Sequence, residues 1–343
     1  MKKLIFIFFS VSMLYSINSY SAALYNNLNP ITIDDDIGLL GTEIKYLSAL
    51  LPPNLKIYIK VLDKYIPYDP LSFPINNISY YIVQVNNIYP LLENYYDYNR
   101  LLHYLSFAQE GLNRIGYRIL ELGLSVQGRI LYALIPKHID TTKITIVMFF
   151  RQHGNEYAQN WIMEGLINTI IAHRIPAWLN NMQFVIYPMI NPDGADNITR
   201  YNANNYDLNR IWDAPKDEIT IIQSHIHSLI TSGNLNVGVV WDMHGSIGDY
   251  INRMPASLVP VEYYNEQSNI ILTLGKYDPW QNGTFIHSSG NPGMARIVMF
   301  SSYGHQALTH ETNDYDSLRT VIDFQNQGVA IYNTMWELFN YIP

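Results

Sequence analysis

The chain contains no cysteine among its 343 residues. This absence excludes disulfide bonds, thiolate nucleophiles and metal sites with cysteine ligands. Any metal that the chain binds must therefore be held by histidine and carboxylate side chains.

Charged residues are also scarce, at 15% of the chain, and the net charge is −8 with no long run of lysine or arginine. Nucleic acids and anionic membrane surfaces attract proteins through clustered basic side chains. We therefore expect neither of them as a partner. The hydrophobic content of 48% is sufficient for a large buried core in one or two domains.

Long apolar runs are restricted to the N-terminus. Two lysines precede an apolar run at residues 4–15, and small residues follow at Ser19, Ser21 and Ala23. This order predicts a secretory signal peptide at residues 1–21. The run is too short to span a bilayer comfortably. We expect an exported chain, periplasmic or secreted, with no membrane association once the signal is removed.

The remaining chain changes its pattern near residue 93. Residues 22–93 are rich in Asn, Tyr, Ile and Pro and carry strand patterns at 56–62 and 80–85, as in a small β-rich domain or a pro-segment. Residues 94–343 alternate between helix and strand patterns, which predicts a three-layer α/β domain. We expect helices at residues 98–114, 161–173 and 317–341. We expect strands at 144–150, 183–189 and 237–242, and a further strand that ends near Thr309.

The first candidate functional residues are His153 and Glu156, which follow the apolar pattern at 144–150. They are three residues apart, so one turn of backbone places both side chains on the same side. Such a pair can supply a nitrogen and an oxygen ligand to Zn²⁺. A single His-x-x-Glu is also common on solvated helix faces, so it does not define a site alone.

Arg200 and Arg210 follow the next strand pattern and a turn at residues 191–194. The turn is ordinary turn chemistry. Two arginines close together in a chain with few charges indicate an anionic ligand, because guanidinium groups suit carboxylates and developing oxyanions.

His244 and Glu311 stand at the ends of two further strand patterns. Asp242 and His244 point the same way on an extended strand, so His244 is a candidate third ligand, or else a satisfied core histidine. A carboxylate such as Glu311 is costly to bury, which makes it a candidate general base beside a metal-bound water. His310 alternates with Glu311 and should face the other way. Ligand sites of open α/β sheets gather at such strand ends.

The order and spacing of these residues resemble the zinc carboxypeptidase family of metallopeptidases. The resemblance runs from about Tyr95 to the C-terminus and includes Ser125-Val-Gln-Gly-Arg129, which is similar to the Ser-x-x-Gly-Arg segment of that family. It implies a three-layer α/β/α fold with a mixed central sheet. It also implies one Zn²⁺ per chain and a peptide or small amide substrate.

The resemblance assigns roles to the candidate residues. His153, Glu156 and His244 would bind zinc and leave a fourth position for water. Glu311 would take a proton from that water and pass it to the leaving amine. Arg200 would stabilise the oxyanion of the tetrahedral intermediate.

The resemblance also assigns the substrate contacts. Asn209 and Arg210 would bind the terminal carboxylate of the substrate and so enforce cleavage at the chain end. Asp207 would accept the second N–H of His153 and fix its tautomer. Arg296 lies where the family builds its side-chain pocket, and would bind an acidic side chain or second carboxylate, or else pair with a surface acid.

Two features leave alternatives open. The mobile tyrosine of the family falls in an interval that holds Tyr250, Tyr263, Tyr264, Tyr277 and Tyr303. The motif His-Gly-Asn-Glu also resembles the corresponding motif of a sister group, the aspartoacylases and succinylglutamate desuccinylases. The resemblance as a whole implies an exported zinc metallocarboxypeptidase. The alternatives are an N-acyl-amino-acid deacylase, a murein peptide amidase, and a non-catalytic protein that binds peptide ends.

Overall fold

The computed structural model describes residues 95–173, 180–232, 235–314, 316 and 319–340, together with the strands at 31–33, 55–61, 64–67 and 80–84. The chain divides into two compact units, Met1–Glu93 and Asn94–Pro343. The predicted signal peptide at residues 1–21 lies outside the described residues, as does much of the segment at 22–93. Both assignments stay predictions.

The described part of the first unit is a four-stranded antiparallel sheet in the order β1-β4-β2-β3. The two strand patterns at 56–62 and 80–85 correspond to β2 and β4, with shifts of one residue at their ends. The strands are β1 (Ile31–Ile33), β2 (Leu55–Val61), β3 (Lys64–Pro67) and β4 (Tyr80–Gln84).

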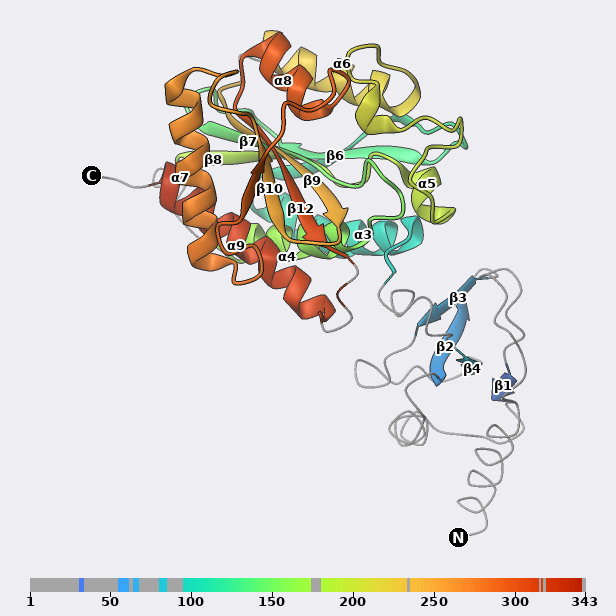
Figure 1. Cartoon of the computed structure of the whole chain (residues 1–343). Helices are drawn as coiled ribbons and strands as arrows, with labels where there is room; N and C mark the ends of the chain where they lie inside the picture. Colours follow the sequence, from blue (N-terminus) through green and yellow to red (C-terminus); the bar gives the residue numbers. More distant parts are fainter. Residues whose placement is uncertain are drawn as a thin grey trace. The chain divides into compact units, whose positions relative to one another are not determined.

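An eight-stranded mixed sheet forms the centre of the second unit (Figure 1). Its order is β11-β10-β12-β9-β7-β8-β6-β5. The four middle strands β12, β9, β7 and β8 are parallel, whereas β10 and β6 pair antiparallel on either side of them. The strands are β5 (Tyr117–Leu124), β6 (Ile130–Pro136), β7 (Ile144–Phe149), β8 (Met182–Tyr187), β9 (Val237–Ser246), β10 (Tyr250–Arg253), β11 (Phe285–His287) and β12 (Ala307–Asn313).

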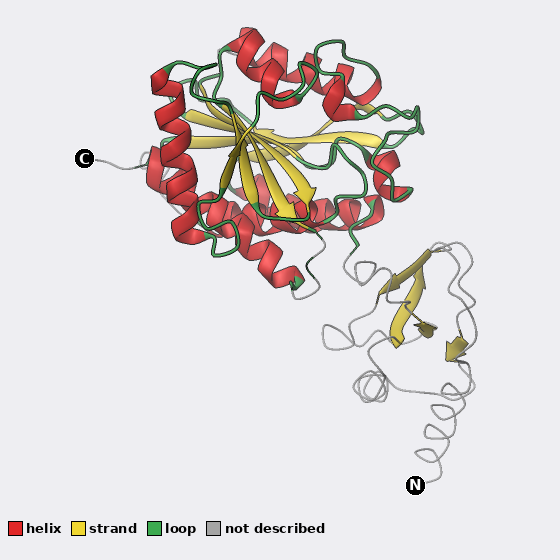
Figure 2. Ribbon diagram, in the orientation of Figure 1, coloured by secondary structure: helices red, strands yellow, loops and turns green. Residues whose placement is uncertain are grey.

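Helices cover both faces of this sheet, which gives the three layers that the sequence predicts (Figure 2). α6 and α8 lie on one face, and α3, α4 and α9 lie on the other, with α7 packed beside α9 (Figure 1). The helices are α3 (Tyr98–Arg114), α4 (Ala158–Ala172), α5 (Pro192–Asp196), α6 (Asp217–Thr231), α7 (Val261–Tyr277), α8 (Ala295–Tyr303) and α9 (Val321–Phe339), with a 3₁₀ turn η3 (Leu208–Arg210). The expectation of a three-layer fold with a mixed sheet is confirmed.

The middle strands are apolar along their length because both of their faces are covered. β8 is buried at all of its six residues, and β7 at five of six. On the α6 and α8 side, Phe149 and Tyr187 pack with Trp212 and Ile222 in one core cluster. This rigid centre fixes the ends of the parallel strands, where the candidate residues lie.

Glycine lets α4 and α9 pack closely on the other face. A Cβ at Gly165 would lie 2.0 Å from the carbonyl oxygen of Gln325, and a Cβ at Gly328 would lie 2.0 Å from that of Ile162. Larger side chains would therefore force the two helices apart. Within the described residues, no helix combines the length and the apolar character that crossing a membrane requires.

Candidate metal centre and active site

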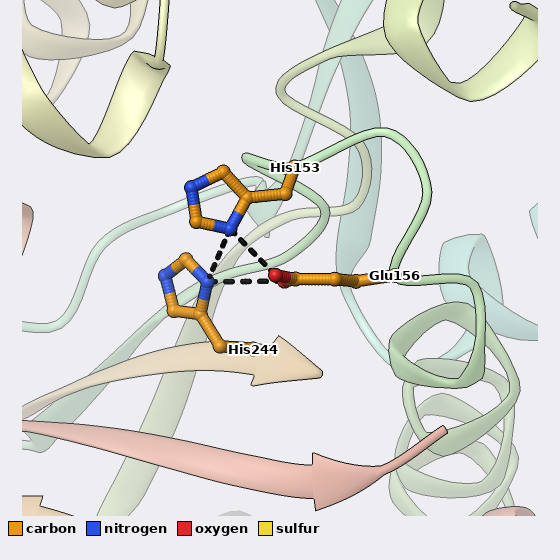
Figure 3. Close-up of side chains that lie close together, drawn as sticks. All are labelled: His153, Glu156 and His244. Atoms are coloured by element: carbon orange, nitrogen blue, oxygen red, sulfur yellow. Dashed lines mark hydrogen bonds and ion pairs between the residues drawn. The ribbon is translucent and has the colours of Figure 1, made fainter. Parts of the chain in front are cut away.

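Three of the predicted residues lie close together near the carboxyl ends of the parallel strands. The loop after β7 carries His153 and Glu156, and β9 carries His244 (Figure 3). One ligand atom from each of them lies within 4.8 Å of the other two, and all three side chains are buried. The structure thus brings together two nitrogens and one carboxylate that are far apart in the sequence.

The contacts within this trio are short. His153 Nδ1 lies 2.7 Å from Glu156 Oε1, and His244 Nδ1 lies 3.1 Å from Glu156 Oε2. The two Nδ1 atoms are 3.0 Å apart (Figure 3). In a tetrahedral zinc site with bonds of about 2.0–2.1 Å, ligand atoms stand roughly 3.3 Å from one another. The spacing of the trio is close to that value.

Each histidine has a carboxylate on its other ring nitrogen. His153 Nε2 lies 3.0 Å from Asp207 Oδ1, and His244 Nε2 lies 3.1 Å from Asp242 Oδ2. A carboxylate accepts an N–H, so it favours the tautomer whose Nδ1 carries a lone pair. Two such lone pairs and the Glu156 oxygens then face one another. A bound cation would accept the nitrogen lone pairs and balance the carboxylate charge. Two nitrogens and one carboxylate therefore form a set of donors that fits zinc.

The electrostatics of the trio agree with a cation site. Burial alone would lower the pKa of His244, but the carboxylates of Asp242 and Glu156 outweigh burial and raise that pKa. Burial alone would raise the pKa of Glu156, but His153 and His244 outweigh it and lower that pKa. The carboxylates therefore create a field that favours positive charge at this point.

Further hydrogen bonds hold the candidate ligand Glu156 in place. Its Oε2 accepts from the amide of Gln159 at 2.7 Å and from the backbone N–H of Gly245 at 3.0 Å. Gly245 follows His244 directly, so the strand that carries one candidate ligand also orients another. Asp207 has a similar double role, because its Oδ2 accepts from Arg200 Nε at 2.9 Å.

Strand register places Glu311 beside the trio. Glu311 on β12 is the direct neighbour of His244 on β9, because the two parallel strands pair residue by residue. The sequence interpretation put both residues at the ends of their strands, but β9 continues to Ser246 and β12 to Asn313. Burial raises the pKa of Glu311 to about 7, and Glu156 and Asp242 contribute in the same direction.

His310 faces away from the site, as its alternation with Glu311 predicts. It is fully buried, and its Nδ1 accepts a hydrogen bond from the indole N–H of Trp241 at 3.3 Å.

The three arginines differ in their surroundings. Arg200 is partly exposed, and its Nη1 lies 3.6 Å from Glu156 Oε1, at the edge of the trio. Arg210 is exposed, and its Nη1 donates to the carbonyl of Asn209 at 2.8 Å. Arg296 is fully buried in α8, and its Nη1 donates to the carbonyl of Ser288 at 3.0 Å. Only Arg200 contacts a member of the trio.

Asn209 is placed differently from the predicted substrate contact. Its side chain is 1% exposed. The amide nitrogen lies 2.8 Å from His244 Nε2, and the amide oxygen accepts from the backbone N–H of Ala295 at 2.9 Å. Because Nε2 carries the N–H that Asp242 accepts, the Asn209 amide nitrogen contacts this atom without a hydrogen bond, and the side chain lies between His244 and the start of α8.

Sequence reasoning missed Asn252, gave no role to Asp242 and did not separate Tyr250 from four other tyrosines. Asp242 carries a recognisable signal, because it stands two residues before His244 on the same face of a strand. Asn252 donates to Glu311 Oε1 at 3.2 Å, but it lies on the short strand β10, which no pattern predicts. Tyr250 on β10 is the direct partner of Glu311, and this register separates it from the other four tyrosines.

The fold and this site together define a class of protein. A mixed sheet between helical layers that presents two histidines, a buried glutamate and a second, partly buried glutamate near the ends of its parallel strands is the arrangement expected of a zinc-dependent hydrolase. The zinc carboxypeptidase family model matches residues 115–229, a range that includes His153, Glu156 and Arg200. His244 and Glu311 lie beyond that range and join the site through the sheet.

Solved structures of metallocarboxypeptidases share the fold. The metallo-carboxypeptidase from Burkholderia cenocepacia has a TM-score of 0.62 and 19% identity, covering 91% of this chain and 86% of its own. The metallo-carboxypeptidase from Pseudomonas aeruginosa has a TM-score of 0.62 and 19% identity, covering 83% and 80%. At these identities the likeness concerns the fold.

A sequence relative points the same way. Cytosolic carboxypeptidase 4 from Mus musculus is 33% identical over 106 residues, which are 29% of this chain and 9% of that protein. The resemblance to the zinc carboxypeptidase family is confirmed. The fold of the metallocarboxypeptidases is confirmed as well, and the His–Glu–His cluster is compatible with zinc.

Proposed function

We propose that this chain is an exported zinc carboxypeptidase that hydrolyses the C-terminal amide bond of peptides. One observation carries the proposal: three donors suited to zinc converge within 4.8 Å of one another, and β12 places the partly buried Glu311 directly beside one of them. When bound, zinc would supply Lewis acidity to a water molecule and to the substrate carbonyl. Export rests on the N-terminal sequence.

The residues around the trio have separate tasks. Glu311 would accept a proton from the attacking water and return it to the leaving amine, as a general base and then a general acid. Arg200 would donate to the oxygen that becomes negative in the transition state, because its guanidinium already borders Glu156. The exposed Arg210 would bind the terminal carboxylate of the peptide.

Hydrolysis of a peptide panel tests the proposed function. The mature protein should release the C-terminal amino acid from peptides and from murein peptides that share this terminus, and a chelator should stop the release. C-terminally amidated peptides should be poor substrates, because they lack the carboxylate that Arg210 binds. Activity on acetyl- or succinyl-amino acids alone would instead support a deacylase. Peptide binding without any hydrolysis would support a non-catalytic protein.

The surroundings of Arg296 favour substrates with an acidic C-terminal side chain. Its contacts are with Thr309 Oγ1 at 3.3 Å, Met254 Sδ at 3.2 Å and the Ser288 carbonyl. Its Nη2 is buried and has no hydrogen-bond partner among the described residues. Burial lowers the pKa of Arg296, the carboxylates of Asp242 and Glu311 oppose this, and a substrate carboxylate would offset more of the cost of burying the cation.

A known complex of a structural neighbour bears on the terminal carboxylate of the substrate. The Pseudomonas aeruginosa enzyme was solved with (2-guanidinoethylmercapto)succinic acid, a ligand that carries succinic acid carboxylates. These carboxylates match the role proposed for Arg210 at the terminal carboxylate, whereas the cationic guanidino group of the ligand gives no support to an acidic side chain at Arg296.

Replacing Arg296 by glutamine should remove this preference. We expect kcat/KM for peptides ending in Glu to fall by about 10- to 100-fold, because a hydrogen bond to a charged group contributes about 1.5–3 kcal/mol. Peptides ending in Leu should lose much less. Arg296→Lys keeps the charge and should retain part of the preference. An equal loss for both peptides in Arg296→Gln would show that Arg296 is structural.

A further inference from the structure

The first described residue of the second unit contacts the loop that carries two of the metal ligands. The hydroxyl of Tyr95 donates to the carbonyl of Gly154 at 2.8 Å and also lies against the carbonyl of Ala195. Gly154 stands between His153 and Glu156 in the sequence. Tyr95 therefore ties the backbone of this loop to α5.

Residues 150–157, between β7 and α4, form the loop that carries His153 and Glu156, and we call it the ligand loop. Its shape depends on side-chain contacts. Arg151 has a φ of 60°, a left-handed conformation that non-glycine residues rarely adopt. Its guanidinium donates to the same Gly154 carbonyl through Nε at 2.9 Å and Nη2 at 2.8 Å, and to Asn160 Oδ1 at 2.8 Å. Such strained backbone persists only where the surrounding contacts fix it.

The ring of Tyr95 completes this support. It lies 5.2 Å from the Arg151 guanidinium and 5.7 Å from the ring of Tyr157, at the two ends of the ligand loop. On the other side, Gly154 packs against the backbone of Gly194, where an added Cβ would come within 2.0 Å. The ligand loop is therefore packed between Tyr95 and the turn at the start of α5.

We propose that Tyr95 is a positioning residue of the metal centre. Its hydroxyl and ring hold the ligand loop so that the donor atoms of His153 and Glu156 meet His244. Residues that orient ligands from outside the coordination sphere change metal affinity when they are replaced. This inference rests on the metal-binding part of the proposed function and not on the reaction or its substrate.

The zinc affinity of the full chain tests the inference. Tyr95→Phe keeps the ring and removes only the hydroxyl, and we expect zinc to bind about 10-fold more weakly, as measured by competition with a chromophoric chelator. Tyr95→Leu also removes the ring contacts and should bind zinc more weakly still. Tyr98→Phe is the matched control, because its hydroxyl donates to the Ile130 carbonyl at 3.0 Å and does not touch the ligand loop.

The melting temperatures of the metal-free variants separate positioning from a general loss of stability. The inference stands if Tyr95→Phe and Tyr98→Phe melt alike and only the first binds zinc more weakly. It is overturned if Tyr95→Phe binds zinc as the unchanged chain does, if Tyr98→Phe is equally impaired, or if the unchanged chain binds no zinc. A chain that binds zinc but cleaves no peptide would refute the proposed function alone, because this comparison needs no substrate.

Discussion

The chain should lose its bound zinc when His244 is replaced by alanine, and peptide hydrolysis should stop with it. His244 supplies one of three protein donors, and its Nδ1 lies 3.0 Å from His153 Nδ1 and 3.1 Å from Glu156 Oε2. Zinc binding energies of about 10–16 kcal/mol are shared among four ligands in structural sites. On that scale, loss of one ligand should weaken binding by about 100-fold or more. Metal analysis after dialysis and a peptide assay would measure both effects.

A histidine outside the site provides the control for this replacement. His227 on α6 contacts the hydroxyl of Tyr303, and no interaction links it to the trio in the part of the chain that the structure describes. His227→Ala should keep the zinc content and activity of the unchanged chain. If His244→Ala kept a full complement of zinc, the assignment of His244 as a ligand would be wrong.

The local part of the metal centre could be predicted from the sequence. His153 and Glu156 lie three residues apart, and this spacing alone places both side chains on one side of the loop. His244 is different, because its approach depends on β9 lying next to β7 in the sheet. No local pattern specifies that strand order. Only the resemblance to a known family could supply it.

The ends of β9 and β12 show why hydrophobic patterns underestimate the length of strands at an active site. The apolar pattern of β9 stops near Asp242 because the side chains become polar there. The backbone ladder nevertheless continues, and it pairs His244 with Glu311 and Ser246 with Asn313. The polar side chains stay in the strands because they satisfy one another or would hold the metal.

The edge of the sheet could not be predicted for a related reason. β10 has four residues and β11 has three, so neither is long enough to show an alternating pattern. Consequently no sequence signal identified Asn252 as a partner of Glu311. The same short strand decides which tyrosine shares a face with Glu311, because paired residues of antiparallel strands project to the same side. That residue is Tyr250.

Replacing Glu311 by glutamine should abolish most of the hydrolysis while zinc stays bound. Glutamine has the same shape as glutamate but cannot take a proton from water, and general base catalysis contributes about 10²- to 10⁴-fold to the rate. We expect kcat to fall by about that factor and zinc content to match the unchanged chain, since Glu311 is not among the three donors. Glu164→Gln changes a buried glutamate outside the site, which pairs with Arg100 at 3.1 Å, and should leave kcat nearly unchanged. Equal rates for Glu311→Gln and the unchanged chain would remove Glu311 from the mechanism. A loss of zinc in Glu311→Gln would instead show that this carboxylate belongs to the metal centre.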